Sequence, residues 1–238
     1  MSRRAESKYL RSSLPGPSME HLPPFPADFR LILASQSPRR HSLLRDMGVP
    51  FTVVPSDAEE VTTGGTAVAL AERNALAKVC GASLPDDLQA GVFVLGTDTL
   101  VTLDGVVMGK PASEAEAARM MASLSGRTHQ VVSAVALVRT GRSRPRLRAD
   151  EVRVASTTTE VTFLSLEAAQ LAAYLASGEW RDKAGAYAVQ GLAALFVSEV
   201  RGEYSNVVGL PLCLLAGLFR ELGFDLLRRQ WLPGARVT

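Results

Sequence analysis

The sequence predicts an α/β fold with a mixed sheet, in which parallel and antiparallel strands are flanked by helices. Short apolar runs typical of buried strands alternate along the chain with stretches of helical pattern. In addition, the apolar run 92–101 meets a second run, 106–108, across an Asp104-Gly105 turn, which indicates a hairpin. Hairpins pair strands antiparallel, whereas strand–helix–strand units pair them in parallel, so we expect both kinds of pairing.

The first half of the chain is predicted to contain a strand, a helix, a strand, a helix and a β-hairpin. These elements span residues 30–35, 38–48, 51–54, 66–80 and, for the hairpin, 92–101 with 106–108. The helix start is clear at Ser37-Pro38, because serine is a preferred N-cap and proline suits the first helical position. Gly48 indicates where that helix ends.

The second half is predicted to contain a helix, two paired strands, a helix, a strand and a final helix. They span residues 113–124, 131–138, 152–163, 166–176, 194–200 and 211–222. Ser113 and Glu116 have the spacing of a helix-capping box. Between the paired strands, arginines alternate at 142, 144, 146 and 148. They indicate a solvated loop or strand face, the alternative being a patch for nucleic acid.

The composition is that of a folded protein and excludes a wholly disordered chain. Of the 238 residues, 47% are hydrophobic and 21% are charged, enough for one large domain or two small lobes. The 26 basic residues nearly balance the 24 acidic ones, so the net charge is +2. This balance is unlike that of a protein that coats nucleic acid, and we expect no nucleic-acid partner.

Residues 1–28 differ from the rest and predict a disordered tail. They contain basic residues and then closely spaced prolines, without an apolar period. A transit peptide is the alternative, although Glu6 and the prolines do not suit an amphipathic helix. We therefore place the domain at 29–225 and a C-terminal tail at 226–238.

We expect a cytoplasmic protein without a membrane partner. No leader-like pattern opens the chain, and the longest apolar stretch, 207–219, is shorter than the roughly 20 residues of a spanning helix. Cys80 and Cys213 have neither a disulfide-framework nor a metal-site spacing. We expect both cysteines to be buried as small hydrophobic side chains in a reducing compartment.

The segment 35–40, Ser-Gln-Ser-Pro-Arg-Arg, joins a strand end to a helix start with two arginines in the first turn. Cations are unfavourable there because the helix dipole prefers negative charge at its N-terminus. A phosphate held by the N-terminal N–H groups and by Arg39 and Arg40 would remove that conflict. The alternative is that both arginines point into solvent.

Asp98 is a lone carboxylate in an almost entirely apolar strand. An unpaired charge is costly there, so Asp98 indicates a metal ligand, a general base or an ion-pair partner. Lys110, across the hairpin, could contact a phosphate or pair with Asp98. Adjacent acids are usually a solvated turn, but in the Glu59-Glu60 pair Glu60 could join Asp98. Two carboxylates completed by water and substrate oxygens meet the needs of Mg²⁺.

The segment 182–191, Asp-Lys-Ala-Gly-Ala-Tyr-Ala-Val-Gln-Gly, places glycines around a short apolar stretch. Gln190 offers the donor and acceptor needed to bind the edge of a base, the alternative being that loop backbone satisfies it. The chain has no Walker loop, dinucleotide fingerprint or nucleophile with its base. His21, His41 and His129 have no metal or triad spacing, and we assign them no role.

Together, these segments resemble the Maf family of nucleoside triphosphate pyrophosphatases. Six strings between residues 30 and 223 carry the resemblance, in the family's order: LILASQSPRRHSLL, VLGTDTLV with GKP, SGRTHQVVSAVAL, EVTF, DKAGAYAVQG and YSNVVGLPL. The resemblance implies two lobes around a central cleft, as in ITPase-like folds, and a homodimer. It also implies hydrolysis of a nucleoside triphosphate to monophosphate and pyrophosphate with Mg²⁺ or Mn²⁺, which cleans the nucleotide pool.

The resemblance implies roles for individual residues as well. The catalytic group would be Asp98, Glu60 and Lys110, with Asp98 and Glu60 as the metal ligands and Asp98 also able to accept a proton. The residues that would bind the substrate are Ser35, Ser37, Arg39, Arg40, Thr99, Lys183 and Gln190.

The chain departs from the family in its second helix. Many members carry a lysine in an LAxxKA string where this chain has Asn74. Lys78 lies one turn later on the same helix face and is a candidate for the same phosphate contact.

The segment 182–191 resembles that of the branch acting on dTTP and UTP, and the substrates could include modified pyrimidine nucleotides. The branch associated with 7-methyl-GTP carries a cysteine-and-glutamate version there. One alternative is therefore a pyrophosphatase for 7-methyl-GTP or another modified purine nucleotide. The alternative from another class is a non-catalytic nucleotide-binding regulator of cell division.

Overall fold

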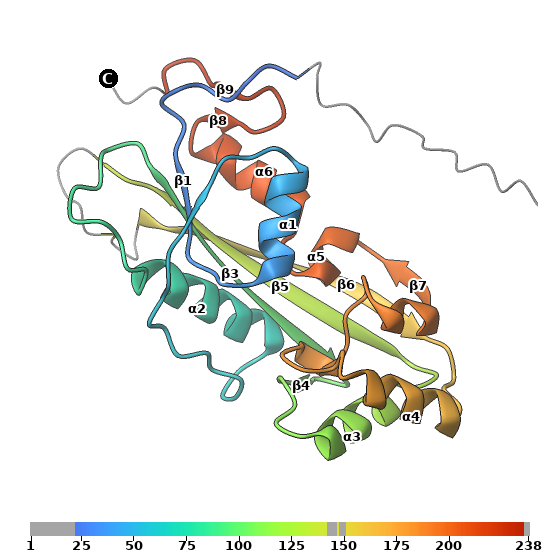
Figure 1. Cartoon of the computed structure of the whole chain (residues 1–238). Coiled ribbons are helices and arrows are strands. Elements are labelled where there is room, and N and C mark those ends of the chain that lie inside the picture. Colours follow the sequence, from blue (N-terminus) through green and yellow to red (C-terminus); the bar gives the residue numbers. More distant parts are fainter. Residues whose placement is uncertain (1–21, 142–146, 148–150, 236–238) are drawn as a thin grey trace, which may run out of the picture.

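The structure is a computed structural model that describes residues 22–141, 147 and 151–235 (Figure 1). Most of the predicted N-terminal tail lies outside the described residues. The alternating arginines at 142, 144, 146 and 148 lie outside them too. None of the described helices is long and apolar enough to cross a membrane.

The described strands form one seven-stranded sheet and a separate two-stranded sheet. Across the large sheet the order is β2-β1-β3-β5-β6-β7, and β4 pairs with β3. β1 is parallel to both of its neighbours, whereas the other pairs are antiparallel, so the predicted mixed sheet is confirmed. The strands are β1 Leu31–Leu33, β2 Thr52–Val53, β3 Phe93–Leu103, β4 Val106–Met108, β5 Thr128–Arg139, β6 Arg153–Phe163, β7 Val197–Arg201, β8 Phe224–Asp225 and β9 Gln230–Trp231.

Helices cover both faces of the large sheet (Figure 1). α2 packs on one face, through an apolar stripe that includes Leu70, Ala71 and Ala75. On the other face, α1 and α6 cover one end, and α3 and α4 cover the other. The helices are α1 Pro38–Asp46, α2 Ala67–Cys80, α3 Glu114–Leu124, α4 Ala168–Ser177, α5 Tyr204–Val208 and α6 Leu212–Glu221.

The alternation of side chains along β3 divides the core into lobes. Side chains with even numbers, such as Val94, face α2, and those with odd numbers face the other helices. On this second face, Leu95 belongs to an apolar cluster with α1 and α6, and Val101 to a cluster with α3 and α4. Thr97 and Thr99 lie between the two clusters, so polar groups mark the boundary between the lobes.

One edge of β3 is unpaired in its middle. β1 pairs with β3 at residues 93–95, and β4 pairs with it at 101–103. Among the described strands, none therefore lies beside residues 96–100 on this edge, whereas β5 pairs along the opposite edge from 93 to 102. This gap places Asp98 at an opening in the sheet.

The packed structure extends beyond residues 29–225 at both ends. Phe25, inside the predicted N-terminal tail, packs on Phe224 with a ring separation of 6.1 Å. Trp231, inside the predicted C-terminal tail, lies in β9, which pairs with β8, and stacks on Phe93 at 5.7 Å. These aromatic contacts join residues far apart in sequence, so no local pattern predicted them.

Two smaller predictions were wrong. The last strand of the large sheet begins at Val197, because the preceding residues, Leu192–Phe196, form a 3₁₀ helix. Cys80 and Cys213 are free and exposed, since each lies on the solvent side of an amphipathic helix. The short helix α5 was not predicted.

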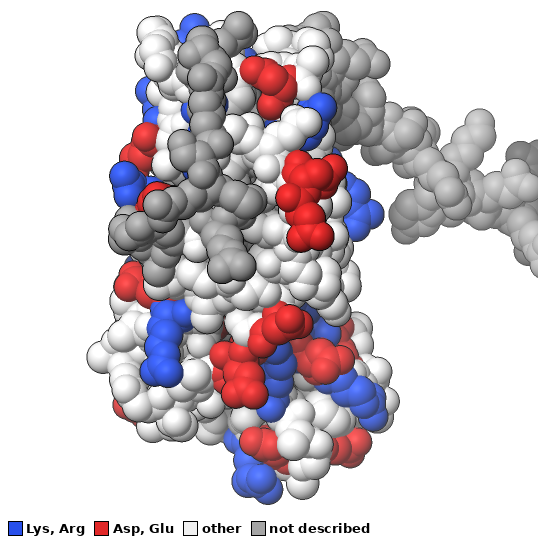
Figure 2. Space-filling view, turned by 90° about the vertical axis from the view of Figure 1, so that its left-hand side faces the viewer, with Lys and Arg blue, Asp and Glu red and all other residues white. Residues whose placement is uncertain are grey.

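The described surface carries mixed charges. On the face seen in Figure 2, Lys and Arg side chains lie among Asp and Glu side chains. Exposed ion pairs include Arg127 with Asp104 at 2.6 Å and Arg201 with Glu160 at 3.4 Å. This interspersion agrees with the near balance of charges in the sequence.

Candidate active site

A cleft of about 1130 Å³ opens at the unpaired edge of β3. It brings together every candidate site residue from the three sequence segments and α2. These candidates are Ser35, Ser37, Arg39, Arg40, Glu60, Lys78, Asp98, Thr99, Lys110, Lys183 and Gln190. Of the adjacent acids, Glu60 lines the cleft and the exposed Glu59 does not.

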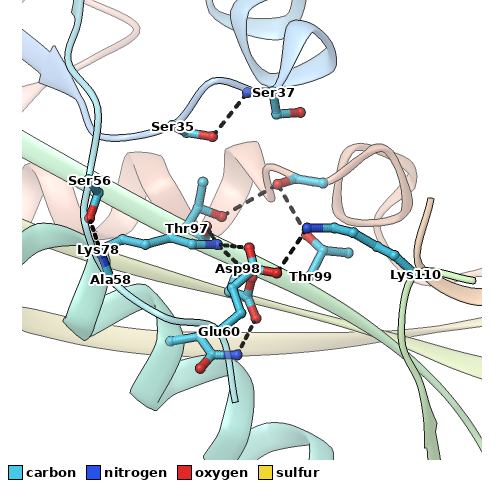
Figure 3. Close-up of polar contacts among 12 residues, drawn as sticks. Ser35, Ser37, Ser56, Ala58, Glu60, Lys78, Thr97, Asp98, Thr99 and Lys110 are labelled. Carbon is cyan, nitrogen blue, oxygen red and sulfur yellow. Dashed lines mark hydrogen bonds and ion pairs between the residues drawn. The ribbon is translucent and has the colours of Figure 1, made fainter. Parts of the chain in front are cut away.

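The N-terminus of α1 forms one wall of the cleft. α1 begins at Pro38, as predicted, but the side chain of Ser37 makes no capping hydrogen bond. The backbone N–H of Ser37 donates to Ser35 Oγ at 3.3 Å (Figure 3). Because the first turn contains no acidic residue, the helix presents unneutralised N–H groups at this end.

Arg40 is buried at the centre of this wall. Its guanidinium donates to three oxygens, Gly209 O at 2.9 Å from Nε, Ser35 Oγ at 3.0 Å from Nη1 and Thr99 Oγ1 at 3.2 Å from Nη2. Burial lowers the pKa of Arg40, and the charge of Asp98 acts in the opposite direction. Arg40 thus joins α1 to β3 and to the turn after α5, and no sequence pattern predicted these contacts.

Arg39 and Lys183 are two further cations of the cleft that interact with each other. Burial lowers the pKa of both side chains, and the charge of Arg39 lowers that of Lys183 further, whereas Asp182 raises both. Lys183 also donates to the carbonyl oxygen of Arg181 at 2.9 Å. The charge of Arg39 acts on Lys183, and two like charges this close together favour an anion beside them.

Glu60 lies between two lysines. Lys78 Nζ donates to Glu60 Oε1 at 2.7 Å, and Lys110 Nζ donates to Glu60 Oε2 at 2.9 Å. The two lysines approach the carboxylate from opposite sides (Figure 3). Burial alone would raise the pKa of Glu60, but the two lysines outweigh it and lower the pKa to about 2.

Asp98 is 3% exposed and is held by α2. Lys78 Nζ donates to Oδ1 at 2.7 Å, and Asn74 Nδ2 donates to Oδ2 at 2.8 Å. The backbone N–H and carbonyl oxygen of Val61 fix the Asn74 amide through two hydrogen bonds of 2.9 Å. Lys78 and Asn74 are four residues apart, so both lie on one face of α2 and donate to the two carboxylate oxygens of Asp98.

Gly96 allows α2 to approach β3 closely enough for these contacts. A Cβ at this position would lie 2.6 Å from the carbonyl oxygen of Ala75 and 2.8 Å from Cγ2 of Val79. These two residues flank Lys78 on α2 and are themselves buried. Any larger residue would therefore push away the helix that holds Asp98.

Asp98 and Glu60 fit a divalent cation in chemistry and position. Both carboxylates bind the same ammonium nitrogen, so they already face one small positive group. Hard oxygen ligands from one or two carboxylates, completed by water and phosphate, are what Mg²⁺ takes. The described residues contain no group of three or more His, Cys, Asp or Glu side chains that could hold a metal. A cation at this place would share its ligands with Lys78.

The segment 182–191 is attached to the β-hairpin. The backbone N–H of Gly185 donates to the carbonyl oxygen of Gly109 at 3.1 Å, directly before Lys110. Gly185 has a φ of +66°, and a Cβ there would lie 2.9 Å from the Val101 side chain. A glycine is therefore required for the segment to lie against β3.

The segment 182–191 also contributes an aromatic side chain and an amide side chain to the cleft. Tyr187 and Gln190 both line the cleft, and Gln190 is exposed. The Glu179 carboxylate accepts hydrogen bonds from the N–H groups of Leu192 at 2.7 Å and Ala193 at 3.2 Å, which fixes the end of the loop. Glu179 was not among the candidates because it lies outside the motif strings.

His129 supports Tyr187. Its Nε2 lies 2.8 Å from the Tyr187 hydroxyl, and Phe163 packs edge-on against both rings. Burial lowers the pKa of His129 to about 4, and its Nδ1 has no hydrogen-bond partner among the described residues. A lone histidine in a strand carries no sequence signal, since its partner lies 58 residues away.

Comparison with known proteins gives the family. Residues 30–222 match the Maf-like protein family. The dTTP/UTP pyrophosphatase of Symbiobacterium thermophilum is 44% identical over 198 residues, covering 83% of this chain and 96% of that protein. The one from Moorella thermoacetica is 47% identical over 199 residues, covering 82% of this chain and 96% of that protein.

Similarity to solved structures is weaker. A nucleoside-triphosphatase / dITP/XTP pyrophosphatase from Mycobacterium abscessus is 21% identical, with a TM-score of 0.35, covering 59% of this chain and 76% of that chain. A likeness this low carries no weight for the function. The family match over residues 30–222 and the two relatives are sufficient to assign the family. This chain belongs to the Maf family.

Proposed function

We propose that this chain is a nucleoside triphosphate pyrophosphatase that hydrolyses dTTP, UTP and modified pyrimidine nucleotides to the monophosphate and pyrophosphate, and so cleans the nucleotide pool. Its relatives from Symbiobacterium thermophilum and Moorella thermoacetica bear the name dTTP/UTP pyrophosphatase. One observation carries the proposal. The carboxylates of Asp98 and Glu60 share a cleft with the N-terminus of α1 and its two arginines.

The triphosphate is bound by the wall that α1 forms. The hydroxyl groups of Ser35 and Ser37, the N–H groups of the first turn and the Arg39 guanidinium all suit phosphate oxygens. Arg40 uses one N–H from each of its three nitrogens on protein oxygens, which leaves two N–H groups for phosphate. Lys183 adds a charge beside Arg39.

Hydrolysis takes place at the carboxylates. Asp98 and Glu60 would hold Mg²⁺ or Mn²⁺, which when bound polarises phosphate oxygens and lowers the pKa of a water molecule. Asp98 accepts the proton of the water that attacks the α-phosphorus, and the bond to the β-phosphate oxygen breaks. Arg39, Arg40 and Lys110 stabilise the charge that develops on the departing pyrophosphate. No covalent enzyme intermediate is required.

The base is bound by the loop after α4. Gln190 supplies a donor and an acceptor for a base edge, and the buried Tyr187 supplies aromatic surface. The competing substrate class is 7-methyl-GTP or another modified purine nucleotide. Initial rates of pyrophosphate release from dTTP, UTP, 7-methyl-GTP, ITP and dATP separate the two classes.

We expect dTTP and UTP to be the best substrates in that series. Faster hydrolysis of 7-methyl-GTP or ITP would move the chain to the purine class. No hydrolysis of any triphosphate, together with tight and steeply salt-dependent oligonucleotide binding, would favour a non-catalytic regulator. The homodimer and the cytoplasmic location stay predictions, which light scattering and fractionation test.

The site residues are tested separately. Asp98→Asn and Arg40→Ala should each lower turnover by about 10² or more. Glu60→Gln should lower it as well, whereas Glu59→Gln, which changes the adjacent acid outside the cleft, should not. Near-wild-type pyrophosphate release by purified Asp98→Asn or Arg40→Ala would refute the assignment.

A further inference from the structure

Lys78 is enclosed by the two carboxylates proposed to hold the divalent cation. Its Nζ donates to Asp98 Oδ1 and Glu60 Oε1 at 2.7 Å each, and to the carbonyl oxygen of Thr97 at 3.3 Å. An ammonium group has three N–H donors, and these three oxygens use all of them. In this arrangement Lys78 has no donor left for a phosphate, so the contact expected from the sequence is not the one it makes.

Lys110 is in a different position. Within the described part of the chain it makes one hydrogen bond, to Glu60 Oε2, and its side chain is 54% exposed in the cleft. This bond uses one of its three N–H groups. Lys110 is therefore the lysine placed to contact phosphate, while Lys78 serves the carboxylates.

Lys78 and a divalent cation compete for the same oxygens. The two carboxylate oxygens lie 2.7 Å from Nζ, and a bound Mg²⁺ would need oxygens at about 2.1 Å. An ammonium group and a doubly charged ion at such distances repel each other strongly. Asn74, which also donates to Asp98, is neutral and cannot replace the charge of Lys78.

We propose that Lys78 is an internal counter-cation, which occupies the divalent-cation position between Asp98 and Glu60 in the nucleotide-free protein and so weakens cation binding there. A triphosphate brings further oxygen ligands and negative charge, which favour the divalent cation over the ammonium group. The inference rests on the proposed function in one respect, because it takes Asp98 and Glu60 as the cation-binding pair. It makes cation binding dependent on the nucleotide.

The test is Mn²⁺ binding to the nucleotide-free protein, measured by electron paramagnetic resonance of free Mn²⁺. Lys78→Gln, which removes the charge and keeps two N–H donors, should bind Mn²⁺ about tenfold more tightly than wild type or better. Adding Asp98→Asn to this variant should abolish the gain. Unchanged or weaker binding by Lys78→Gln would overturn the proposal.

Lys110→Gln is the matched control. It removes the same charge from the same glutamate, but from the exposed side. We expect its Mn²⁺ affinity to change by less than about threefold, because solvent screens that charge. If Lys110→Gln tightens Mn²⁺ binding as much as Lys78→Gln does, the location of Lys78 has no special effect and the proposal fails.

Wild-type protein provides a test that needs no variant. Mn²⁺ alone should leave the Tm unchanged, whereas Mn²⁺ with a dTTP analogue carrying a methylene group between the α- and β-phosphates should raise it. An equal rise with Mn²⁺ alone contradicts the proposal. None of these measurements uses hydrolysis. If the wild-type protein hydrolyses the triphosphate but Lys78→Gln has the Mn²⁺ affinity of wild type, only this inference is refuted. If Lys78→Gln binds Mn²⁺ more tightly but the wild-type protein hydrolyses no triphosphate, only the proposed function is refuted.

Discussion

The side chain of Arg40 is tied to a carbonyl group 169 residues later in the chain. Its Nε donates to the carbonyl oxygen of Gly209 at 2.9 Å. Gly209 has a φ of +122°, a conformation that side chains rarely allow, so glycine is what lets this carbonyl group face the arginine. The contact joins the start of α1 to the turn that follows α5, and it therefore holds the cleft together.

Arg40→Lys should show that the shape of the guanidinium matters as well as its charge. Lysine keeps the charge but cannot reach Gly209, Ser35 and Thr99 from three separate nitrogens. We expect the free energy of unfolding to fall by about 2 kcal/mol and kcat/KM to fall about tenfold or more. Denaturant unfolding and steady-state kinetics measure both effects. Arg45→Lys, at the exposed end of α1, should leave both near wild type.

Gly96→Ala should displace α2 from β3. The new Cβ would meet the carbonyl oxygen of Ala75 at 2.6 Å, and backbone cannot move away as a flexible side chain can. We expect a loss of stability of about 2 kcal/mol and a large loss of turnover, because Lys78 moves away from Asp98. Thermal unfolding and pyrophosphate release are the measurements.

Gly217→Ala is the control for this substitution. Gly217 lies in α6, and apart from its chain neighbours and the helix's own backbone, no atom of the described residues would lie within 4 Å of a Cβ there. Alanine should raise the stability by up to about 1 kcal/mol, since it favours the helix more than glycine does. If both alanine variants behave alike, the close approach at Gly96 is not needed.

His129 should make the stability depend on pH. Burial lowers its pKa from 6.5 to about 4 in the folded protein, so protonation favours the unfolded chain. Above pH 6.5 the imidazole is neutral in both the folded and the unfolded chain, so it does not affect the stability. As the pH falls from 6.5 toward 4, the unfolded chain binds a proton more readily than the folded protein, and the free energy of unfolding decreases. The loss attributable to this group is at most about 3 kcal/mol.

Denaturant unfolding at a series of pH values tests this expectation. In His129→Gln, the decline between pH 6.5 and 4 should be smaller than in wild type. His41→Gln, which alters the half-buried histidine of α1, should keep the wild-type decline. Parallel pH curves for wild type and His129→Gln would show that another group causes the decline.

Trp231→Ala should weaken the fold without altering the chemistry. The ring stacks on Phe93 at 5.7 Å, and the Arg139 guanidinium lies 4.1 Å from its centroid. We expect a loss of about 2 kcal/mol, with kcat unchanged at low temperature because Trp231 does not line the cleft. Leu227→Ala, at a position 73% exposed, should cost almost nothing. A fall in kcat with unaltered Tm would contradict this role.

Helix starts and the hairpin could be predicted because they depend on neighbouring residues. Ser113 Oγ accepts a hydrogen bond from the N–H of Glu116 at 3.2 Å, as the capping pattern predicted. The Glu116 carboxylate in turn accepts from the N–H of Ala112 at 2.8 Å. Asp104, with a φ of 51°, closes the hairpin between β3 and β4. Such contacts span only a few positions and leave a local pattern.

The residues of the cleft could be predicted for another reason. A carboxylate in an apolar strand, such as Asp98, and arginines at a helix N-terminus, such as Arg39 and Arg40, are costly unless they meet a partner. Their presence therefore indicates a site from the sequence alone. All the candidates chosen in this way, or through the family resemblance, line one cleft.

The class of fold, most of the elements and the residue types of the cleft can be inferred from the amino-acid sequence, because they follow from local patterns and from charged residues in unfavourable positions. Which partner each charged side chain contacts depends on how the elements pack in the folded protein. Lys78 binds the carboxylates of Asp98 and Glu60 because Gly96 lets α2 lie close to β3. From the helical spacing alone, Lys78 could equally have contacted a phosphate, because the distance at which a helix packs on a strand cannot be inferred from the local sequence of either element.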